Sequence, residues 1–294
     1  MRKSISYKVL WLAFTAMLFI GCASKKLNQR FTLWRNDKIP YGTYYSFENL
    51  DHVFPSADIE INKEAPDKAL ISLYYDDDFN EEEAGEVKQE DSAEVQYRSL
   101  YLVITPSMEP DEKELRSLMN YISAGNHVFI SSLRIGKNLL DSLRVEAAGY
   151  SGLYDFSDSL TISIEDEEDR KEFHYPGRGL DNYLTDFDSS ITTILGYNEE
   201  DEPNFVKFTY EGGGSIYLHF APAAFTNFFL LHGENSRYYD IALSDLPENI
   251  GNVMWDDYYR YHSNGKTKGA GGSNAFSKLG VFLKDDILRW PVWL

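Results

Sequence analysis

The sequence of 294 residues contains a single cysteine, Cys22. With no second cysteine, the chain cannot form an internal disulfide bond. The rest of the chain also has no thiol for nucleophilic catalysis and no thiolate ligand for a metal ion. Cysteine chemistry is therefore excluded everywhere except close to the N-terminus.

Basic side chains are also scarce. The chain has 28 Lys and Arg residues against 47 Asp and Glu residues, and its formal net charge is −19. Duplex nucleic acid and anionic lipid headgroups both require a basic surface, so we exclude nucleic acid as a partner. The hydrophobic content of 43% is sufficient for one large globular domain.

Several motifs of catalysis and cofactor binding are missing. Neither Gly-x-Ser-x-Gly nor His-Glu-x-x-His occurs, and the six histidines show no ligand spacing. A Walker A loop is incomplete because Arg260 stands where its first glycine is required, ahead of Gly265. His127 and His219 lie in or beside apolar runs and are better explained as core residues. We therefore predict no cofactor and no metal site.

The first 21 residues have the pattern of a secretory signal peptide. A basic start is followed by an apolar run and then by Gly21-Cys22, a typical lipoprotein cleavage site. Phe19 departs from the leucine that is usual three positions before the cysteine. We predict lipid on Cys22 and a tether over residues 22–30; an uncleaved N-terminal anchor is the alternative. Either form places the chain in the cell envelope, membrane-anchored and facing the periplasm.

The central part of the chain predicts a strand–helix–strand unit. Leu100–Ile104 is a short apolar run, and Thr105-Pro106-Ser107 is expected to end it. Pro110 and nearby acidic residues indicate a helix start, and Gly125 indicates its end. A second apolar run, Val128–Ile130, follows at once. This order is the repeating unit of a parallel sheet.

Other segments predict further elements. Helices are expected at 42–54, 137–143, 225–232 and 236–246, and strands at 59–61, 69–75, 160–164, 191–195, 205–210, 216–220 and 253–255. The glycines of 211–215 favour a β-hairpin turn over a phosphate loop, because a strand rather than a helix follows. Residues 76–94 predict an acidic loop that lacks the glycine of an EF-hand. A flexible linker and an amphipathic helix are expected over residues 263–294.

The most suggestive side chains follow the last predicted strand. Asp256-Asp257-Tyr258-Tyr259 stands at a strand end, where open α/β sheets gather their ligands. Two carboxylates with the tyrosines and His262 could hold a metal or a polar ligand there. The alternative is that one aspartate caps a helix or bonds to a loop while the tyrosines pack.

Four segments together resemble a known family. They are Asp37–Tyr44 (DKIPYGTY), Val103–Pro106, His219–Pro222 with Phe225–Asn227, and Trp255–Tyr259 (WDDYY). In this order they resemble domain-of-unknown-function family 4350 (DUF4350) of the Bacteroidetes type, over about residues 33–290. The resemblance implies a flavodoxin-like domain similar to class I glutamine amidotransferases. It also implies genes next to a MoxR-type AAA ATPase and a von Willebrand factor A-like protein, and no established activity.

The chain departs from the family pattern in two places. Asp256-Asp257 stands where the family often has Asp-Glu, and the chain ends at Leu294 where members usually continue into a transmembrane helix. Glutamine hydrolysis by an amidotransferase needs a cysteine nucleophile, and residues 31–262 have none. The resemblance therefore implies the fold without that reaction.

These observations lead to one expected fold and two expected functions. We predict a single three-layer α/β domain over residues 31–262, with a mainly parallel sheet that is mixed at one edge. The favoured function is non-catalytic binding or scaffolding of an envelope protein partner in a MoxR-associated system. The alternative is a hydrolase or carbohydrate-active enzyme that uses the carboxylates of Asp256 and Asp257. A purely structural lipoprotein is a third possibility. The expected ligand site comprises Asp256, Asp257, Tyr258, Tyr259 and Asn227.

Overall fold

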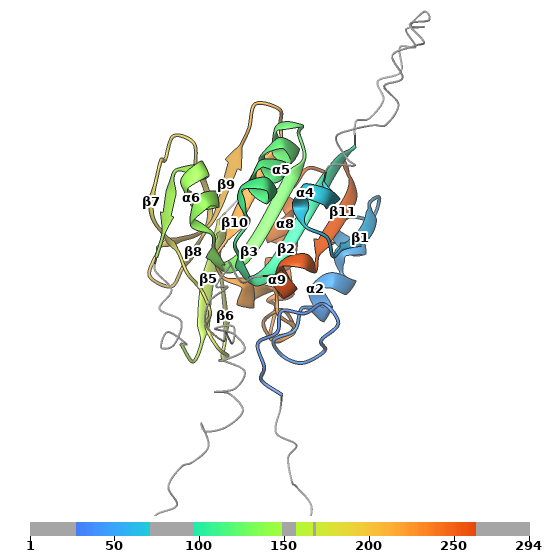
Figure 1. Ribbon diagram of the computed structural model, residues 1–294. Helices are drawn as coiled ribbons and strands as arrows, with labels where there is room; N and C mark the ends of the chain where they lie inside the picture. The colour runs from blue at the N-terminus through green and yellow to red at the C-terminus, as the bar shows by residue number, and fades with distance from the viewer. Residues whose placement is uncertain (1–27, 71–96, 149–156, 167–168, 263–294) are drawn as a thin grey trace, which may run out of the picture.

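The computed structural model describes residues 28–70, 97–148, 157–166 and 169–262. Over these ranges the chain forms a nine-stranded sheet in the order β1-β11-β2-β3-β10-β9-β8-β5-β6, with a separate β4-β7 pair (Figure 1). The strands are β1 (Asp58–Asn62), β2 (Arg98–Met108), β3 (His127–Ile135), β4 (Val145–Ala147), β5 (Leu160–Glu165), β6 (Arg170–Tyr175), β7 (Leu184–Phe187), β8 (Thr193–Asn198), β9 (Pro203–Thr209), β10 (Ser215–His219) and β11 (Ile250–Asp256).

The main sheet changes character at β10. The neighbours β1, β11, β2, β3 and β10 are all parallel. From β10 outward, the pairings with β9, β8, β5 and β6 are all antiparallel. The β4-β7 pair is antiparallel as well. The main sheet is therefore parallel from β1 to β10 and antiparallel from β10 to β6, so the antiparallel part is half of the sheet rather than one edge.

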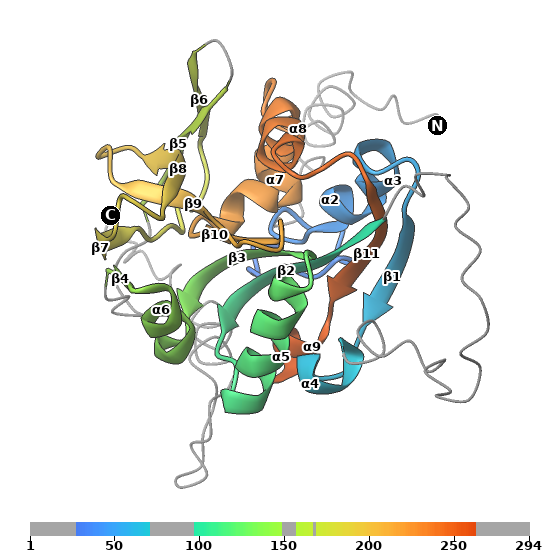
Figure 2. The same ribbon diagram turned by 90° about the horizontal axis from the view of Figure 1, so that it is seen from above.

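The predicted fold class is wrong. A flavodoxin-like, three-layer domain with a mainly parallel sheet does not accommodate four antiparallel pairings in succession. The physical reason lies in the connections: the turns after β5, β8 and β9 are too short for a crossover helix, so each following strand must run antiparallel. Figure 2 shows helices above and below the parallel strands, whereas β5, β6 and β8 project beyond them.

The central strand–helix–strand unit is confirmed, with one correction. Helix α5 (Glu112–Ser123) begins with a capping box between Asp111 and Glu114, and Gly125 has a φ of 89° at its end. Strands β2 and β3 are parallel neighbours. However, β2 continues through Pro106 to Met108. Since Trp255 of β11 is level with Leu102, β2 is an edge strand beyond that point, where proline is tolerated.

The sheet separates two apolar cores. Alternating residues of β2 divide between them: Leu100 and Leu102 enter one core, whereas Tyr101 and Val103 enter the other. Helices on the first face are α2 (Tyr44–Glu48), α3 (Leu50–Val53), α7 (Asn227–Leu230) and α8 (Ser236–Ser244), with the 3₁₀ turn η2 (Pro222–Phe225). Helices on the second face are α4 (Pro66–Ala69), α5, α6 (Lys137–Leu143) and α9 (Tyr258–His262) (Figure 2).

Most of the other predicted elements are confirmed to within a few residues. The glycine-rich segment 211–215 connects antiparallel β9 and β10, and Gly213 has a φ of 80° there. The helix expected at 42–54 is divided into α2 and α3, and the strand expected from residue 69 begins instead with the end of α4. Residues 71–94 and 263–294 lie outside the described part of the chain.

Candidate functional site

Asp256 and Asp257 lie at the carboxyl edge of the parallel strands. β11 ends at Asp256, and the backbone N–H of Asp257 donates to the Asn62 carbonyl oxygen of β1 at 2.7 Å. Helix α9 then packs beside the extension of β2 past Leu102. Parallel strands share this edge, so the predicted position at a strand end is confirmed.

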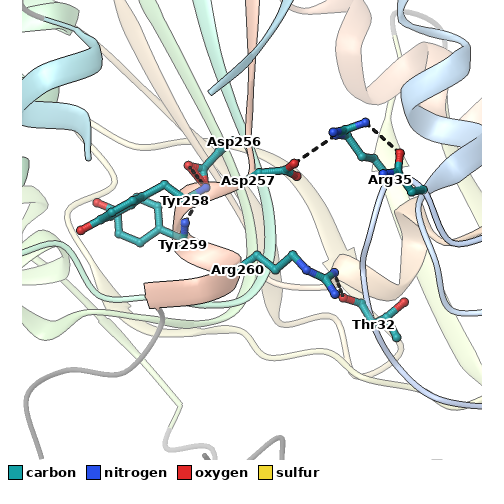
Figure 3. A network of polar contacts seen from close by, with 8 residues as sticks. Thr32, Arg35, Asp256, Asp257, Tyr258, Tyr259 and Arg260 are labelled. Atoms are coloured by element: carbon teal, nitrogen blue, oxygen red, sulfur yellow. Dashed lines mark hydrogen bonds and ion pairs between the residues drawn. The ribbon is translucent and has the colours of Figure 1, made fainter. Parts of the chain in front are cut away.

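The Asp256 carboxylate is fully engaged within the fold (Figure 3). Its Oδ1 accepts from the Tyr101 hydroxyl at 2.7 Å and from the Tyr258 backbone N–H at 3.2 Å. Its Oδ2 accepts from the Tyr259 backbone N–H at 2.8 Å. Burial raises the pKa of Asp256 to about 7, although these three hydrogen bonds favour the ionised form. Asp256 thus caps the start of α9.

The Asp257 carboxylate faces the other side of the sheet. Its Oδ2 accepts from Arg35 Nε at 3.2 Å, and both side chains are nearly buried, with exposures of 5% and 13%. The Arg35 guanidinium also lies 5.1 Å from the centre of the Phe47 ring. This pair fastens the N-terminal segment to the end of β11, as Figure 3 shows.

Tyr258 and Tyr259 bond to a buried glutamate on α5. The Tyr258 hydroxyl donates to Glu114 Oε1 at 2.8 Å, and the Tyr259 hydroxyl donates to Oε2 at 3.1 Å. Oε2 also accepts from the Asp111 backbone N–H at 2.9 Å. The two tyrosines therefore join α9 to the first turn of α5. The alternative interpretation of WDDYY, a cap with packed tyrosines, describes this arrangement.

Asn227 does not lie with these residues. Its Nδ2 donates to the carbonyl oxygens of Asp37 at 2.8 Å and Ile39 at 2.7 Å, and its Oδ1 accepts from the Tyr45 backbone N–H at 2.7 Å. Two of these bonds hold the loop before α2, and the third holds the first turn of α2. Asn227 is thus a structural staple for the N-terminal segment.

The N-terminal segment is bonded to parts of the chain that are far from it in sequence. Arg260 Nη1 donates to the Thr32 carbonyl oxygen at 3.1 Å, and the Arg260 guanidinium lies 4.6 Å from the centre of the Trp34 ring. Together with Arg35–Asp257 and Asn227, these contacts bind residues 31–45 to α7 and α9. Residues 31–45 are far in sequence from α7 and α9, so only the structure shows that they are in contact.

A cavity of about 1000 Å³ opens beyond this network, where β2 and β3 end. We call it the strand-end cavity. It is lined by the residues that follow β2 and β3, by β4 and by α9: Glu109, Pro110, Asp111, Glu114, Arg134, Ile135, Gly136, Lys137, Asn138, Leu140, Asp141, Val145, Glu146, Ala147, Ala148, Asn182, Tyr258, Tyr261 and His262. Of the predicted site residues, only Tyr258 lines it.

The rim of the strand-end cavity is held by short-range contacts. The Gly136 backbone N–H donates to the Met108 carbonyl oxygen at 2.8 Å, and Asn138 Nδ2 donates to the Pro110 carbonyl oxygen. A Cβ on Gly136 would lie 3.1 Å from Glu109 Cα and 3.3 Å from Pro110 Cδ, so the ends of β2 and β3 approach closely at a glycine. The cavity could have been anticipated from the sequence only through the polar segments that follow the apolar strands β2 and β3.

The two histidines predicted as core residues are confirmed as such. His127 Nδ1 lies 2.8 Å from Ser215 Oγ, and His219 lies between Ser131 Oγ at 2.8 Å and the Tyr238 hydroxyl at 2.7 Å. Both rings are buried. Over the described ranges, no three His, Cys, Asp or Glu residues are grouped so as to hold a metal ion, and no helix is long and apolar enough to cross a membrane.

Comparisons with known proteins give only remote similarities. No protein-family model matches the chain, and no curated protein matches it. Solved structures with partial similarity include the N-terminal domain of mmIFT52 (13% identity, TM-score 0.38, covering 50% of this chain and 76% of that one). Others are the exo-β-1,4-mannosidase Op5Man5 from Opitutaceae bacterium strain TAV5 (11%, 0.35, 50% and 25%) and α-L-fucosidase isoenzyme 2 from Paenibacillus thiaminolyticus (15%, 0.31, 50% and 24%).

These similarities do not bear on function. The chain spans about a quarter of the length of the two glycosidases. All three TM-scores are below 0.5, so these similarities carry no argument about the fold of this chain. Function must be argued from the site itself.

Proposed function

We propose that this chain is a membrane-tethered, extracytoplasmic binding domain without catalytic activity, whose strand-end cavity receives its ligand. The observation that carries the proposal is the place of that cavity, at the carboxyl ends of two central parallel strands. Its walls come from four separate parts of the chain, as is common for ligand sites. The bound partner is an envelope component, as the resemblance to DUF4350 and its MoxR-associated setting suggests.

The engagement of the two aspartates argues against the enzymatic alternative. An acid–base pair must face one pocket with room for a substrate between its carboxylates. Asp256 bonds to Tyr101 on one face of the sheet, whereas Asp257 bonds to Arg35 on the other. Neither residue lines the strand-end cavity. Hydrolysis by this pair therefore has no support in the geometry.

The fastening of residues 31–45 supports the tether. Those residues are bonded to the end of β11 and to α9, at the same edge of the sheet as the strand-end cavity. A lipid on Cys22 would be joined to this segment through residues 23–30. Metabolic palmitate labelling of the wild-type chain and of Cys22→Ala tests this part of the proposal. Labelling that persists in Cys22→Ala contradicts it.

Photo-crosslinking in intact cells tests the binding role. A photoreactive residue in place of Tyr261, which is 62% exposed on the cavity rim, is expected to yield a covalent adduct with an envelope component. The matched control is the same replacement of Leu231, which is 65% exposed outside the cavity. The proposal requires an adduct at residue 261 that is absent at residue 231. Equal labelling at both positions, or none at either, contradicts it.

A further inference from the structure

Two opposite charges in the strand-end cavity are only loosely paired. Arg134 Nη2 lies 3.8 Å from Glu109 Oε1, beyond hydrogen-bond distance, and each side chain is about one-third exposed. Arg134 Nε is buried and donates to no atom of the described chain. Glu109 is held from the other side, because its Oε1 accepts from Ser107 Oγ at 3.0 Å. Because Nε is buried, a ligand in the cavity would meet the guanidinium at its terminal nitrogens, of which Nη2 lies 3.8 Å from Glu109.

The other charges of the strand-end cavity limit what that ligand can be. Five carboxylates line the cavity, against the basic side chains of Arg134 and Lys137. Lys137 Nζ already bonds to Asp141 at 2.8 Å, and the Glu114 carboxylate is occupied by tyrosines. A phosphate would be repelled by this excess of negative charge. A purely cationic ligand would leave the Arg134 donors unused.

We propose that the strand-end cavity binds a small molecule with an α-amino-acid head group, an inference that rests on the proposed function. The ligand carboxylate accepts from the Arg134 guanidinium, and the ligand ammonium donates to Glu109. One carbon atom carries both groups, so a single head group meets two charges that lie 3.8 Å apart. Charge-assisted hydrogen bonds to a guanidinium suit a carboxylate, which the planar fork can grip with two donors.

Aromatic side chains complete the site on the α9 side. The Tyr258 ring stacks on His262 with a centroid distance of 4.3 Å, and Tyr261 is exposed beside them. The volume of about 1000 Å³ far exceeds an amino-acid head group and matches a drug-sized ligand. We therefore expect a bulky apolar or aromatic substituent beyond the head group.

Isothermal titration calorimetry of the purified full chain provides the test. The probes are the twenty amino acids, each aromatic one also as its N-acetyl and methyl ester derivatives. We expect aromatic amino acids to bind and both blocked derivatives to lose affinity by roughly 10–100-fold, because each block removes one charged hydrogen bond. Arg134→Gln and Glu109→Gln should cause similar losses. The matched controls are Arg116→Gln and Glu112→Gln, exposed charges outside the cavity.

The outcomes separate this inference from the proposed function. Equal affinity for free and blocked amino acids overturns it, as does unchanged affinity in both cavity variants. If no amino acid binds while residue 261 still gives its adduct, the ligand class is wrong and the binding role stands. The comparison of free and blocked ligands uses the wild-type chain, so the test remains decisive even if Arg134→Gln fails to fold.

Discussion

The carboxylates of Asp256 and Asp257, adjacent in sequence, are bonded on opposite faces of the sheet. Asp256 accepts from Tyr101 at 2.7 Å, within the core below α5, whereas Asp257 pairs with Arg35 at 3.2 Å beside Phe47. Asp256 is the last residue of β11 and Asp257 follows it, so their side chains leave the extended chain on opposite faces. Asp256 holds α9 and β2 to the end of β11, whereas Asp257 holds the N-terminal segment there. Both carboxylates therefore have a structural role.

The Arg35–Asp257 pair should contribute strongly to stability. Arg35→Met keeps much of the aliphatic contact with Phe47 but leaves the Asp257 carboxylate buried without its partner. We expect the free energy of unfolding to fall by roughly 2–4 kcal/mol, as when one member of a buried ion pair is removed. Urea denaturation at pH 7 measures this change.

The matched control is Lys137→Met, which breaks the exposed Lys137–Asp141 pair. Its side chains are 84% and 57% exposed, so solvent already screens their attraction. A loss of stability in Lys137→Met as large as that in Arg35→Met would show that the Arg35–Asp257 contact has no special role.

The second prediction concerns the pH dependence caused by Asp256. Burial raises its pKa in the folded state to about 7, from 3.8 in the unfolded chain. The folded state then holds a proton that the unfolded state releases, so this contribution to stability is full below pH 3.8 and is lost as the pH rises to 7. Relative to Asp256→Asn, the wild-type free energy of unfolding should fall by up to about 1.4 kcal/mol per pH unit in this window.

Tyr101→Phe tests the cause of the Asp256 titration. The hydrogen bond from the Tyr101 hydroxyl lowers the pKa of Asp256, opposing the effect of burial. Its removal should therefore move the pKa of Asp256 above about 7. Carbon-13 NMR titration of the carboxyl group reports this shift directly, and an unchanged or lower pKa in the variant contradicts the assignment.

His219 should produce a pH dependence of the opposite sign. Burial lowers its pKa to about 3 in the folded state, from 6.5 when exposed. The unfolded state then binds the proton more tightly, so stability is full above pH 6.5 and falls as the pH decreases towards 3. His219→Gln should reduce the slope of unfolding free energy by up to about 1.4 kcal/mol per pH unit between pH 6 and 4. Burial lowers the pKa of His127 only to about 4. His127→Gln should therefore reduce the slope over a narrower pH range than His219→Gln.

The fold could be predicted from sequence only in its local parts. Helix α5 was readable from its acidic first turn and from Gly125, because caps are encoded by neighbouring residues. The direction of β5 and β8 was not readable, since an apolar run indicates a strand without its partner. Strand β6, whose sequence RKEFHY has no apolar run, was not predicted at all. Helix α9 was anticipated only in the alternative interpretation, in which one aspartate caps a helix, because its start depends on the Asp256 cap at the end of a longer strand.

The candidate site shows the same division. Asp256 and Asp257 were placed correctly at a strand end, but their partners Tyr101 and Arg35 are 155 and 222 residues away. No local sequence pattern reveals such contacts. From the sequence alone, two carboxylates that are bonded within the fold cannot be distinguished from two that are free to bind a ligand. Glu109 and Arg134 stand out only when β2 and β3 are placed side by side.

The final prediction concerns Tyr259, through which α9 is held against α5. Its ring is buried, and its hydroxyl donates to Glu114 Oε2 at 3.1 Å. Tyr259→Phe removes a charge-assisted hydrogen bond and leaves the glutamate less satisfied in a site that water does not easily reach. We expect a loss of roughly 1.5–3 kcal/mol in the free energy of unfolding, measured by urea denaturation.

Tyr258→Phe provides the comparison, because its hydroxyl donates to the other oxygen of the same carboxylate at 2.8 Å. Tyr258 is only partly buried and lines the strand-end cavity, so water can replace its hydroxyl in the variant. Its stability should therefore change less than that of Tyr259→Phe. If Tyr258→Phe were the more destabilising of the two, the shorter bond at the cavity wall would be the main link between α5 and α9.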